Sequence, residues 1–264
     1  MIPLNRHITK KMLPLILLLP FFSPYSFSAT PPGNDDTTRA RRILDEVDDL
    51  WRSTSSSAVI TMQVKTEHYT RTVKMESWSK GKEKSLVRII FPLKEKGTAT
   101  LKSENNIYTY LPKTDRTIRL TSSMMMGSWM GSHFTNDDLV KESRLAEDYD
   151  PRITFEGARN GEDVIEFTLI PKPDAPVVWG KIVTTVYAKD HIPIITKYFD
   201  EDMVLTRTMA FSDIKMMGGR RIPVVLVVVP TDKPDEYTKL VYEQIKFDLQ
   251  LADSFFSIKQ LRRK

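Results

Sequence analysis

The sequence has no cysteine among its 264 residues and only four histidines. Without cysteine the chain can form no disulfide bond, and it offers neither a thiol nucleophile nor a cysteine metal ligand. The histidines are scattered, and none stands in the H-E-x-x-H pattern of a zinc protease. The G-x-S-x-G motif, the P-loop and the glycine-rich dinucleotide fingerprint are also missing, which disfavours most common enzyme classes.

The polar patterns that remain give weak support for catalysis. Ser-x-x-Lys spacings begin at Ser77, Ser79 and Ser212, but neither Ser-Asp-Asn nor Lys-Thr-Gly accompanies them, as a penicillin-binding site requires. The adjacent carboxylates of Asp137 and Asp138 are more typical of a helix end than of a metal site. We therefore predict a protein that is not an enzyme, with no catalytic residues, no metal ion and no cofactor.

The start of the chain predicts a secretory signal peptide, residues 1–28. Three basic residues precede the apolar run Met12–Phe22, which is shorter than the about 20 apolar residues that span a bilayer. Ser26 and Ser28 supply small side chains for cleavage after Ser28, and an uncleaved anchor is the alternative. Export of a chain without cysteine favours the bacterial periplasm over a eukaryotic secreted scaffold.

The basic balance of the whole chain comes mainly from its first residues. The formal net charge is +5, and residues 1–28 contribute three Lys and Arg residues and no acidic residue to it. Residues 29–264 therefore carry 36 Lys and Arg against 34 Asp and Glu, a charge of +2. Nucleic-acid-binding proteins present a clustered basic face, so we expect no nucleic-acid partner.

The remainder of the chain predicts one long helix followed by many short strands. Apolar residues recur at helical spacing over Arg39–Ser53, with Asp36 or Thr37 as the expected N-cap. From Ala58 the period changes to two, and the strands alternate with polar turns at roughly ten-residue spacing. This pattern is typical of an antiparallel meander in a sandwich or barrel. Because no long linker divides residues 29–264, we predict one domain.

The stretch TSSMMMGSWMGSHFTNDDL, Thr121–Leu139, follows no regular period and is named here the methionine-rich segment. It holds four Met, one Trp and one Phe among Ser and Gly. Methionine adapts to apolar partners of different shape, and Gly127 and Gly131 let the backbone bend. We predict that the segment is a lid over an apolar cavity; a plain plug of the core is the alternative. A short helix should follow it, capped by Thr135 or Asn136.

Four stretches of the sequence carry a resemblance to a known family: MESWSKGKEKSLVRIIFPLKEKGTATLK, NNIYTYLPKTDRTIRL, MMGSWMGSHFTNDDLVKES and ADSFFSIKQLR. Together they resemble the outer-membrane lipoprotein-sorting proteins of the LolA/LolB-like superfamily. The resemblance implies a mainly β fold, an unclosed antiparallel β-barrel of about eleven strands with helices capping the open face. It also implies an apolar cavity for acyl chains, covered by the helix Arg39–Ser53 and by Thr121–Asp148. The polar residue that locks the lid of LolA has no recognised counterpart in the sequence, which leaves the cargo open between a lipoprotein and another lipid.

From this resemblance we predict a periplasmic carrier that hides acyl chains and delivers them toward the outer membrane. Hiding is needed because exposure of an acyl chain to water costs roughly 0.8 kcal/mol per CH₂. The expected partners are lipoprotein or lipid acyl chains, an inner-membrane exporter and an outer-membrane acceptor. A non-enzymatic accessory protein docked on an envelope transporter is the alternative. The residues predicted to contact lipid are Met62, Met75, Trp78, Tyr108, Tyr110, Met124, Met125, Met126, Trp129, Met130 and Phe134.

Overall fold

The computed structural model describes residues 34–104, 106–141, 145–173, 175 and 177–263. The predicted signal peptide, its cleavage site and the alternative membrane anchor lie outside these residues. Within the described part of the chain, no helix combines the length and the apolar character that crossing a bilayer requires.

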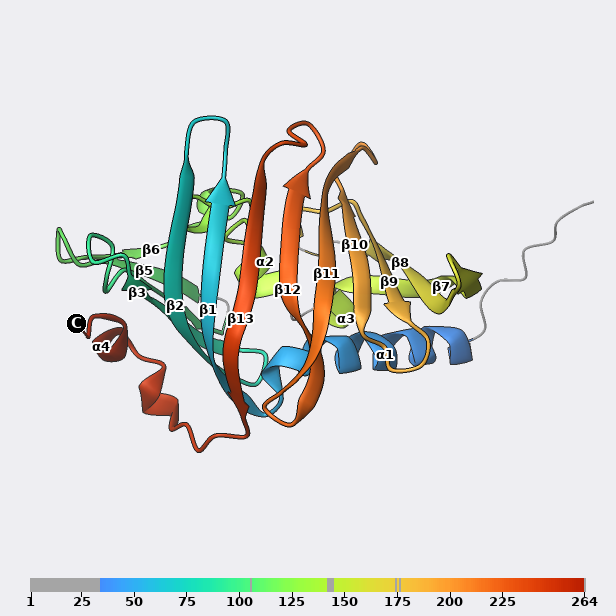
Figure 1. The fold of residues 1–264 in the computed structure, drawn as a ribbon, viewed down its shortest axis with the longest axis horizontal. Helices are drawn as coiled ribbons and strands as arrows, with labels where there is room; N and C mark the ends of the chain where they lie inside the picture. The colour runs from blue at the N-terminus through green and yellow to red at the C-terminus, as the bar shows by residue number, and fades with distance from the viewer. Residues whose placement is uncertain (1–33, 105, 142–144, 174, 176, 264) are drawn as a thin grey trace, which may run out of the picture. The chain divides into compact units, whose positions relative to one another are not determined.

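The described strands form one antiparallel sheet of thirteen strands in the order β6-β5-β4-β3-β2-β1-β13-β12-β11-β10-β9-β8-β7 (Figure 1). Their bounds are β1 Ser55–Lys65, β2 Thr70–Lys80, β3 Lys84–Phe91, β4 Ala99–Ser103, β5 Asn106–Leu111, β6 Arg116–Arg119, β7 Tyr149–Arg159, β8 Glu162–Pro171, β9 Lys181–Tyr187, β10 Pro193–Phe199, β11 Leu205–Met217, β12 Arg220–Pro230 and β13 Tyr237–Phe247. Because β6 and β7 are the two end strands, the sheet does not close. The predicted fold class is confirmed, with thirteen described strands rather than about eleven.

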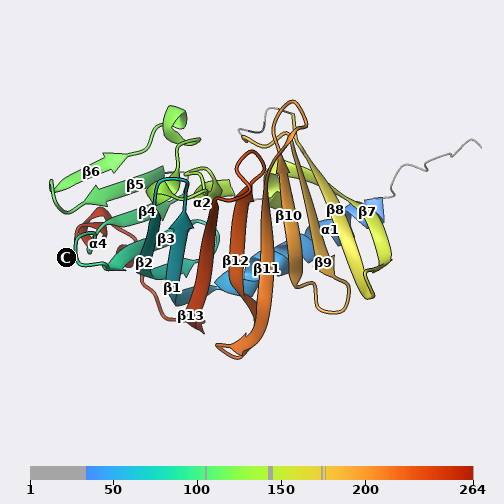
Figure 2. The same ribbon diagram turned by 45° about the horizontal axis from the view of Figure 1, so that its top comes forward.

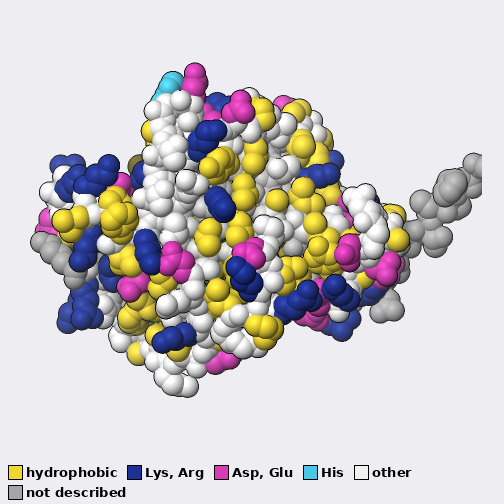
Figure 3. Space-filling view, in the orientation of Figure 1, with side chains coloured by type: hydrophobic (Ala, Val, Ile, Leu, Met, Phe, Trp, Pro, Cys, Tyr) yellow, Lys and Arg dark blue, Asp and Glu magenta, His cyan; other side chains and the backbone are white. Residues whose placement is uncertain are grey.

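The two faces of the sheet differ in what covers them. Figures 1 and 2 show α1 (Asn34–Arg52), α2 (Asp138–Lys141) and α3 (Leu145–Asp148) on the same face, which we name the inner face. In β1 the buried side chains alternate with half-buried ones, as expected where successive side chains point to opposite faces. On the other, outer face of the central strands, charged and apolar side chains are interspersed (Figure 3). The main core therefore lies between the sheet and the helices.

α1 begins earlier than the sequence predicts. It starts at Asn34, so Asp36 and Thr37 lie inside the helix, and the predicted N-cap is wrong. The predicted end is off by one residue, because Ser53 has a φ of 54° and this left-handed conformation cannot continue a right-handed helix.

Apolar packing and ion pairs hold α1 against the sheet. Ile43 and Leu44 are buried in the main core, and each fully buried side chain of this kind contributes about 1.5–3 kcal/mol. Arg39 donates hydrogen bonds of 2.7 and 2.6 Å to the two carboxylate oxygens of Glu156 on β7. The helix is thus fixed near its start on the end strand of the sheet.

The methionine-rich segment contains two short 3-10 turns, η1 Ser122–Met124 and η2 Trp129–Gly131. Within the helix predicted to follow it, the structure describes α2 and α3 as helical. Thr135 Oγ1 accepts a hydrogen bond of 3.2 Å from the Asp138 N–H, and the Thr135 N–H donates one of 2.7 Å to Asp138 Oδ2. This reciprocal pair is a capping box, so Thr135 rather than Asn136 caps the start of α2.

The C-terminal residues cover part of the outer face. Trp78, Leu86, Leu101 and Tyr108 are successive cross-strand partners on β2, β3, β4 and β5. The segment that contains η4 (Asp253–Phe255) and α4 (Ile258–Leu261) packs on this region, with the Trp78 and Phe255 rings 5.4 Å apart. A second, smaller core results, separated from the main core by the thickness of the sheet.

Candidate functional site

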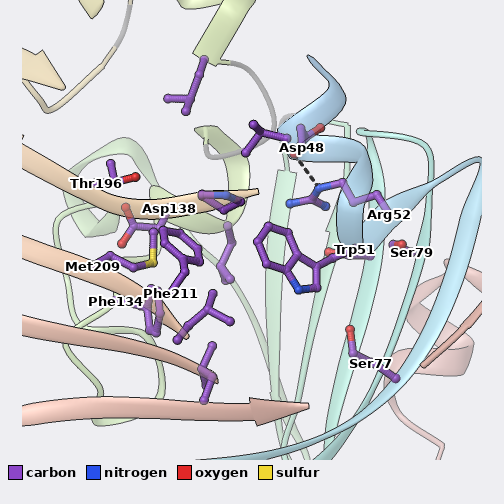
Figure 4. A pocket seen from close by; sticks show the side chains of 18 of the residues that line it. Asp48, Trp51, Arg52, Ser77, Ser79, Phe134, Asp138, Thr196, Met209 and Phe211 are labelled. Carbon is purple, nitrogen blue, oxygen red and sulfur yellow. Dashed lines mark hydrogen bonds and ion pairs between the residues drawn. The ribbon is translucent and has the colours of Figure 1, made fainter. Parts of the chain in front are cut away.

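A cavity of about 220 Å³ lies on the inner face between the sheet and the helices. Side chains from α1, the methionine-rich segment, α2, α3 and eight of the strands line it. Figure 4 shows Trp51, on the last turn of α1, between the two ends of this cavity. The Trp51 ring contacts Phe211 at 5.8 Å and Tyr242 at 6.4 Å between centroids, and its Nε1 donates a 3.3 Å hydrogen bond to the Pro223 carbonyl. The end of α1 is therefore fixed across the cavity by an aromatic cluster.

One end of the cavity is mainly apolar, although Thr196 and Asp138 also line it near Met209 (Figure 4). Its apolar lining comes from β1, β2, β11, β12 and β13, namely Ile60, Met75, Met209, Phe211, Leu226 and Leu240. Their carbon and sulfur atoms offer no strong hydrogen-bonding group, so this end suits hydrocarbon.

The other end of the cavity is polar, with Ser56, Ser77, Ser79 and Ser85 on the inner face of β1, β2 and β3. Ser56 and Ser79 share a buried hydrogen bond of 2.8 Å between their hydroxyls. Asp48 of α1 and Arg52, one turn later, also face this end (Figure 4). The cavity as a whole is therefore amphiphilic.

Ion pairs border the polar end. Arg52 Nε donates to Asp48 Oδ1 at 3.0 Å, and Lys82 Nζ donates to Asp45 Oδ1 at 2.7 Å. Burial raises the pKa of the Asp48 carboxyl above its ordinary range, and the charges of Arg52 and Lys82 only partly offset this. Raised acid pKa values reflect a charge held away from water, which is frequent at functional sites.

The methionine-rich segment closes the cavity through Trp129 and Phe134, both of which line it. Trp129 Nε1 donates a 3.2 Å hydrogen bond to Thr100 Oγ1 on β4, and the Trp129 N–H donates one of 2.8 Å to the Phe134 carbonyl. Both rings are buried, with 6% of their surface exposed. The segment thus places two aromatic side chains into the core as a cover.

A buried ion pair joins this cover to the sheet. Arg207 of β11 donates two hydrogen bonds to the Asp138 carboxylate, at 2.6 and 2.8 Å, and one of 3.0 Å to the His133 carbonyl. Only 6% of the Arg207 side chain and 8% of the Asp138 side chain are exposed. The guanidinium also lies 4.5 Å from the Trp179 ring centroid and 4.3 Å from that of Tyr198. This constellation was not predicted from the sequence, since Asp138 was expected to act only as a helix-end charge.

Two side chains at the start of β2, Tyr69 just before it and Arg71 within it, bind the backbone carbonyls of the turn η2. The Tyr69 hydroxyl donates a 3.3 Å hydrogen bond to the Gly131 carbonyl, and Arg71 Nη1 donates to the Met130 carbonyl. Met130 and Gly131 have φ values of 49° and 68°, in the left-handed region. Gly131 is suited to that conformation, whereas Met130 is strained in it.

The structure brings together only some of the residues predicted to contact lipid. Met75, Trp129 and Phe134 line the cavity, while Met62 is buried in the main core beside it. Trp78, Tyr108 and Tyr110 belong to the second core with the C-terminal residues. Met124 and Met126 are exposed, and Met125 and Met130 are half-buried without lining the cavity. Contact with lipid stays a prediction for every one of these residues, and the polar lining residues were missed.

Among the described residues, no group of three or more His, Asp or Glu side chains is arranged to hold a metal ion.

Comparison with solved structures shows the fold. A domain from Vibrio parahaemolyticus described as an outer membrane lipoprotein-sorting protein is 22% identical, with a TM-score of 0.75, and 86% of this chain aligns with 100% of that one. A DUF1329 family protein from Desulfovibrio piger is 20% identical, with a TM-score of 0.76 over 86% of this chain and 99% of that one. A LolA superfamily protein from Nitrosomonas europaea is 21% identical, with a TM-score of 0.71 over 84% and 98%. The architecture is therefore LolA-like.

Comparison of the sequence with protein families shows the family. No curated protein matches the sequence. A family model described as "-like: Uncharacterized protein" matches residues 81–263, more than half of the chain. The chain thus belongs to the family of uncharacterised proteins that this model describes, and it shares the fold of the LolA-like lipoprotein-sorting proteins.

Proposed function

We propose that the protein is a periplasmic carrier that binds an acyl chain of a lipoprotein or lipid in the inner-face cavity and delivers it toward the outer membrane. The observation that supports this is the cavity itself, with an apolar end closed by α1, Trp129 and Phe134. Each methylene hidden from water contributes roughly 0.8 kcal/mol, so even part of a chain binds favourably in such a space. Catalysis plays no part in the proposed function.

The size of the cavity sets a condition on loading. Its volume, about 220 Å³, is below the about 300–1,000 Å³ typical of small-molecule pockets. A complete acyl chain therefore enters only if α1 or the methionine-rich segment moves outward. The ion pair between Asp138 and Arg207 then sets part of the cost of opening. A carrier needs such a moderate cost, because it must also release its cargo.

The test fills part of the cavity with a larger side chain at one lining position. Ala58 lines the cavity on β1, so in Ala58→Phe the new ring occupies the space proposed for the acyl chain. Ala210→Phe on β11 is the control, because Ala210 is exposed. Lipid that co-purifies with the protein from its native envelope is measured by extraction and mass spectrometry, and fatty-acid binding is measured by titration.

We expect lipid in the wild type and in Ala210→Phe, and its loss in Ala58→Phe with a cooperative unfolding transition retained. Absence of both co-purified lipid and fatty-acid binding in the wild type would remove the carrier proposal. The docked accessory protein would then be the better account, since it requires no ligand in the cavity.

A further inference from the structure

The inner face shows a gradient of polarity along three neighbouring strands. Its rows of cross-strand partners are Ser56–Ser79–Ser85, then Ala58–Ser77–Val87, then Ile60–Met75–Ile89. Each row is more apolar than the one before it. The members of the first two rows and Ile60 and Met75 of the third line the cavity. The polar rows would not stabilise a purely hydrocarbon ligand, because burying serine hydroxyls against it without polar partners is unfavourable.

The polar row lies beside the charged side chains at the end of α1. Asp48 and Arg52 come from the helix, and Lys82 comes from the turn between β2 and β3. Asp45 and Asp48 together balance the charges of Lys82 and Arg52. The polar end therefore has no excess of positive charge with which to select a purely anionic head group.

One oxygen atom at this end needs a donor. Asp48 Oδ1 accepts from Arg52, but Oδ2 is buried and no described residue donates a hydrogen bond to it. Lys82 Nζ lies 3.8 Å from Oδ2, beyond hydrogen-bonding distance. A buried carboxylate oxygen without a donor destabilises the folded protein, and a charged donor compensates this more strongly than a neutral one.

We propose that the cavity binds an amphiphile in one orientation, with its acyl chain toward Met75 and Met209 and an N–H-bearing ammonium head group at Asp48 Oδ2. The ethanolamine group is a head group of this chemistry. The inference rests on the proposed carrier function and adds to it the class of ligand and the direction in which it lies. The serine row solvates the polar linkage between the chain and the head group.

The test compares two amphiphiles whose ammonium groups carry either three N–H groups or three methyl groups. Lysophosphatidylethanolamine and lysophosphatidylcholine with the same acyl chain are titrated into the protein by calorimetry, below their micelle concentrations. Both are zwitterionic, but only the ethanolamine ammonium carries N–H groups. We expect the wild type to bind the ethanolamine compound at least about 10-fold more tightly, the ratio that one charge-assisted hydrogen bond supplies.

A matched pair of variants assigns the preference to Asp48. In Asp48→Asn the ratio of the two affinities should fall toward 1, whereas the exposed Asp49→Asn on the same helix should retain the wild-type ratio. Equal wild-type affinities for the two compounds would overturn the inference and leave the carrier function standing. An unchanged ratio in Asp48→Asn would overturn the assignment to this carboxylate. Binding of neither compound, together with no co-purified lipid, would instead remove the carrier function.

Discussion

The buried pair between Asp138 and Arg207 allows the attachment of the cover to be tested directly. Arg207→Met removes the guanidinium and leaves the Asp138 carboxylate buried, while the capping box between Thr135 and Asp138 remains. Loss of one partner of a buried ion pair costs about 3–5 kcal/mol. For a chain of this size that corresponds to a fall of about 6–20 °C in the melting temperature. If loss of the pair instead lowers the free energy of local opening of the cover, a fluorescent fatty acid should enter and leave the cavity faster than in the wild type.

Two further variants separate the charge effect from a general loss of packing. Arg207→Met combined with Asp138→Asn removes the unpaired charge and keeps a capping side chain, so it should recover much of the lost stability. Arg159 is a matched control, since it pairs with Glu166 at 2.6 Å and lies 4.4 Å from the Phe155 ring centroid but is 42% exposed. Arg159→Met should cost no more than about 1 kcal/mol. If Arg207→Met changes neither the melting temperature nor the exchange rate by more than this control, the pair does not hold the cover.

The remaining predictions concern three separate sites. Thr135→Ala removes the capping box of α2 and should cost about 1 kcal/mol in urea unfolding, while Thr135→Ser should cost less. Phe256→Ala empties part of the second core and should cost about 3–5 kcal/mol, yet leave fatty-acid affinity unchanged because the sheet lies between it and the cavity. The raised pKa of Asp48 means that the folded state binds this proton more tightly than the unfolded state. Stability is therefore lost as the pH rises from the ordinary Asp value of 3.8 through the raised value, and Asp48→Asn should flatten this slope in melting curves and be more stable at neutral pH. A steeper pH dependence of stability in Asp48→Asn than in the wild type would contradict the raised pKa of Asp48.

The strand pattern could be read from the sequence, but the face of each strand could not. Alternating residues predicted β2 and its neighbours correctly, because the period of two is local. Met75 and Trp78 were both expected to face the cavity, yet they lie three positions apart on one strand and so point to opposite faces. Only the register with Leu86 and Leu101, and the cover supplied by the C-terminal residues, shows that Trp78 belongs to the outer face.

The methionine-rich segment shows a second limit. Its composition indicated an apolar cover, and Trp129 and Phe134 do enter the core. However, Met124 and Met126 lie at or just beyond η1 and are exposed, because a segment without a regular period does not reveal which of its apolar side chains turn inward. The partner of Asp138 stands 69 residues further along the chain on β11, and no local pattern connects the two. The polar end of the cavity was missed for a similar reason, since its serines are ordinary strand residues in sequence.

The chemistry that holds the methionine-rich segment suits a cover that must open. Apolar packing alone would expose its whole buried area on opening, at about 25 cal/mol per Å². A buried ion pair behaves differently, because the charges of Asp138 and Arg207 are rehydrated when the cover moves into water, and this recovers much of the desolvation penalty they bear when closed. The pair therefore fixes the closed position through its geometry more than through net stabilisation. Replacing Arg207 by Met and Asp138 by Asn, which still caps α2, should then give a protein of comparable stability that exchanges its acyl chain more slowly, and faster exchange in that double variant would refute this account.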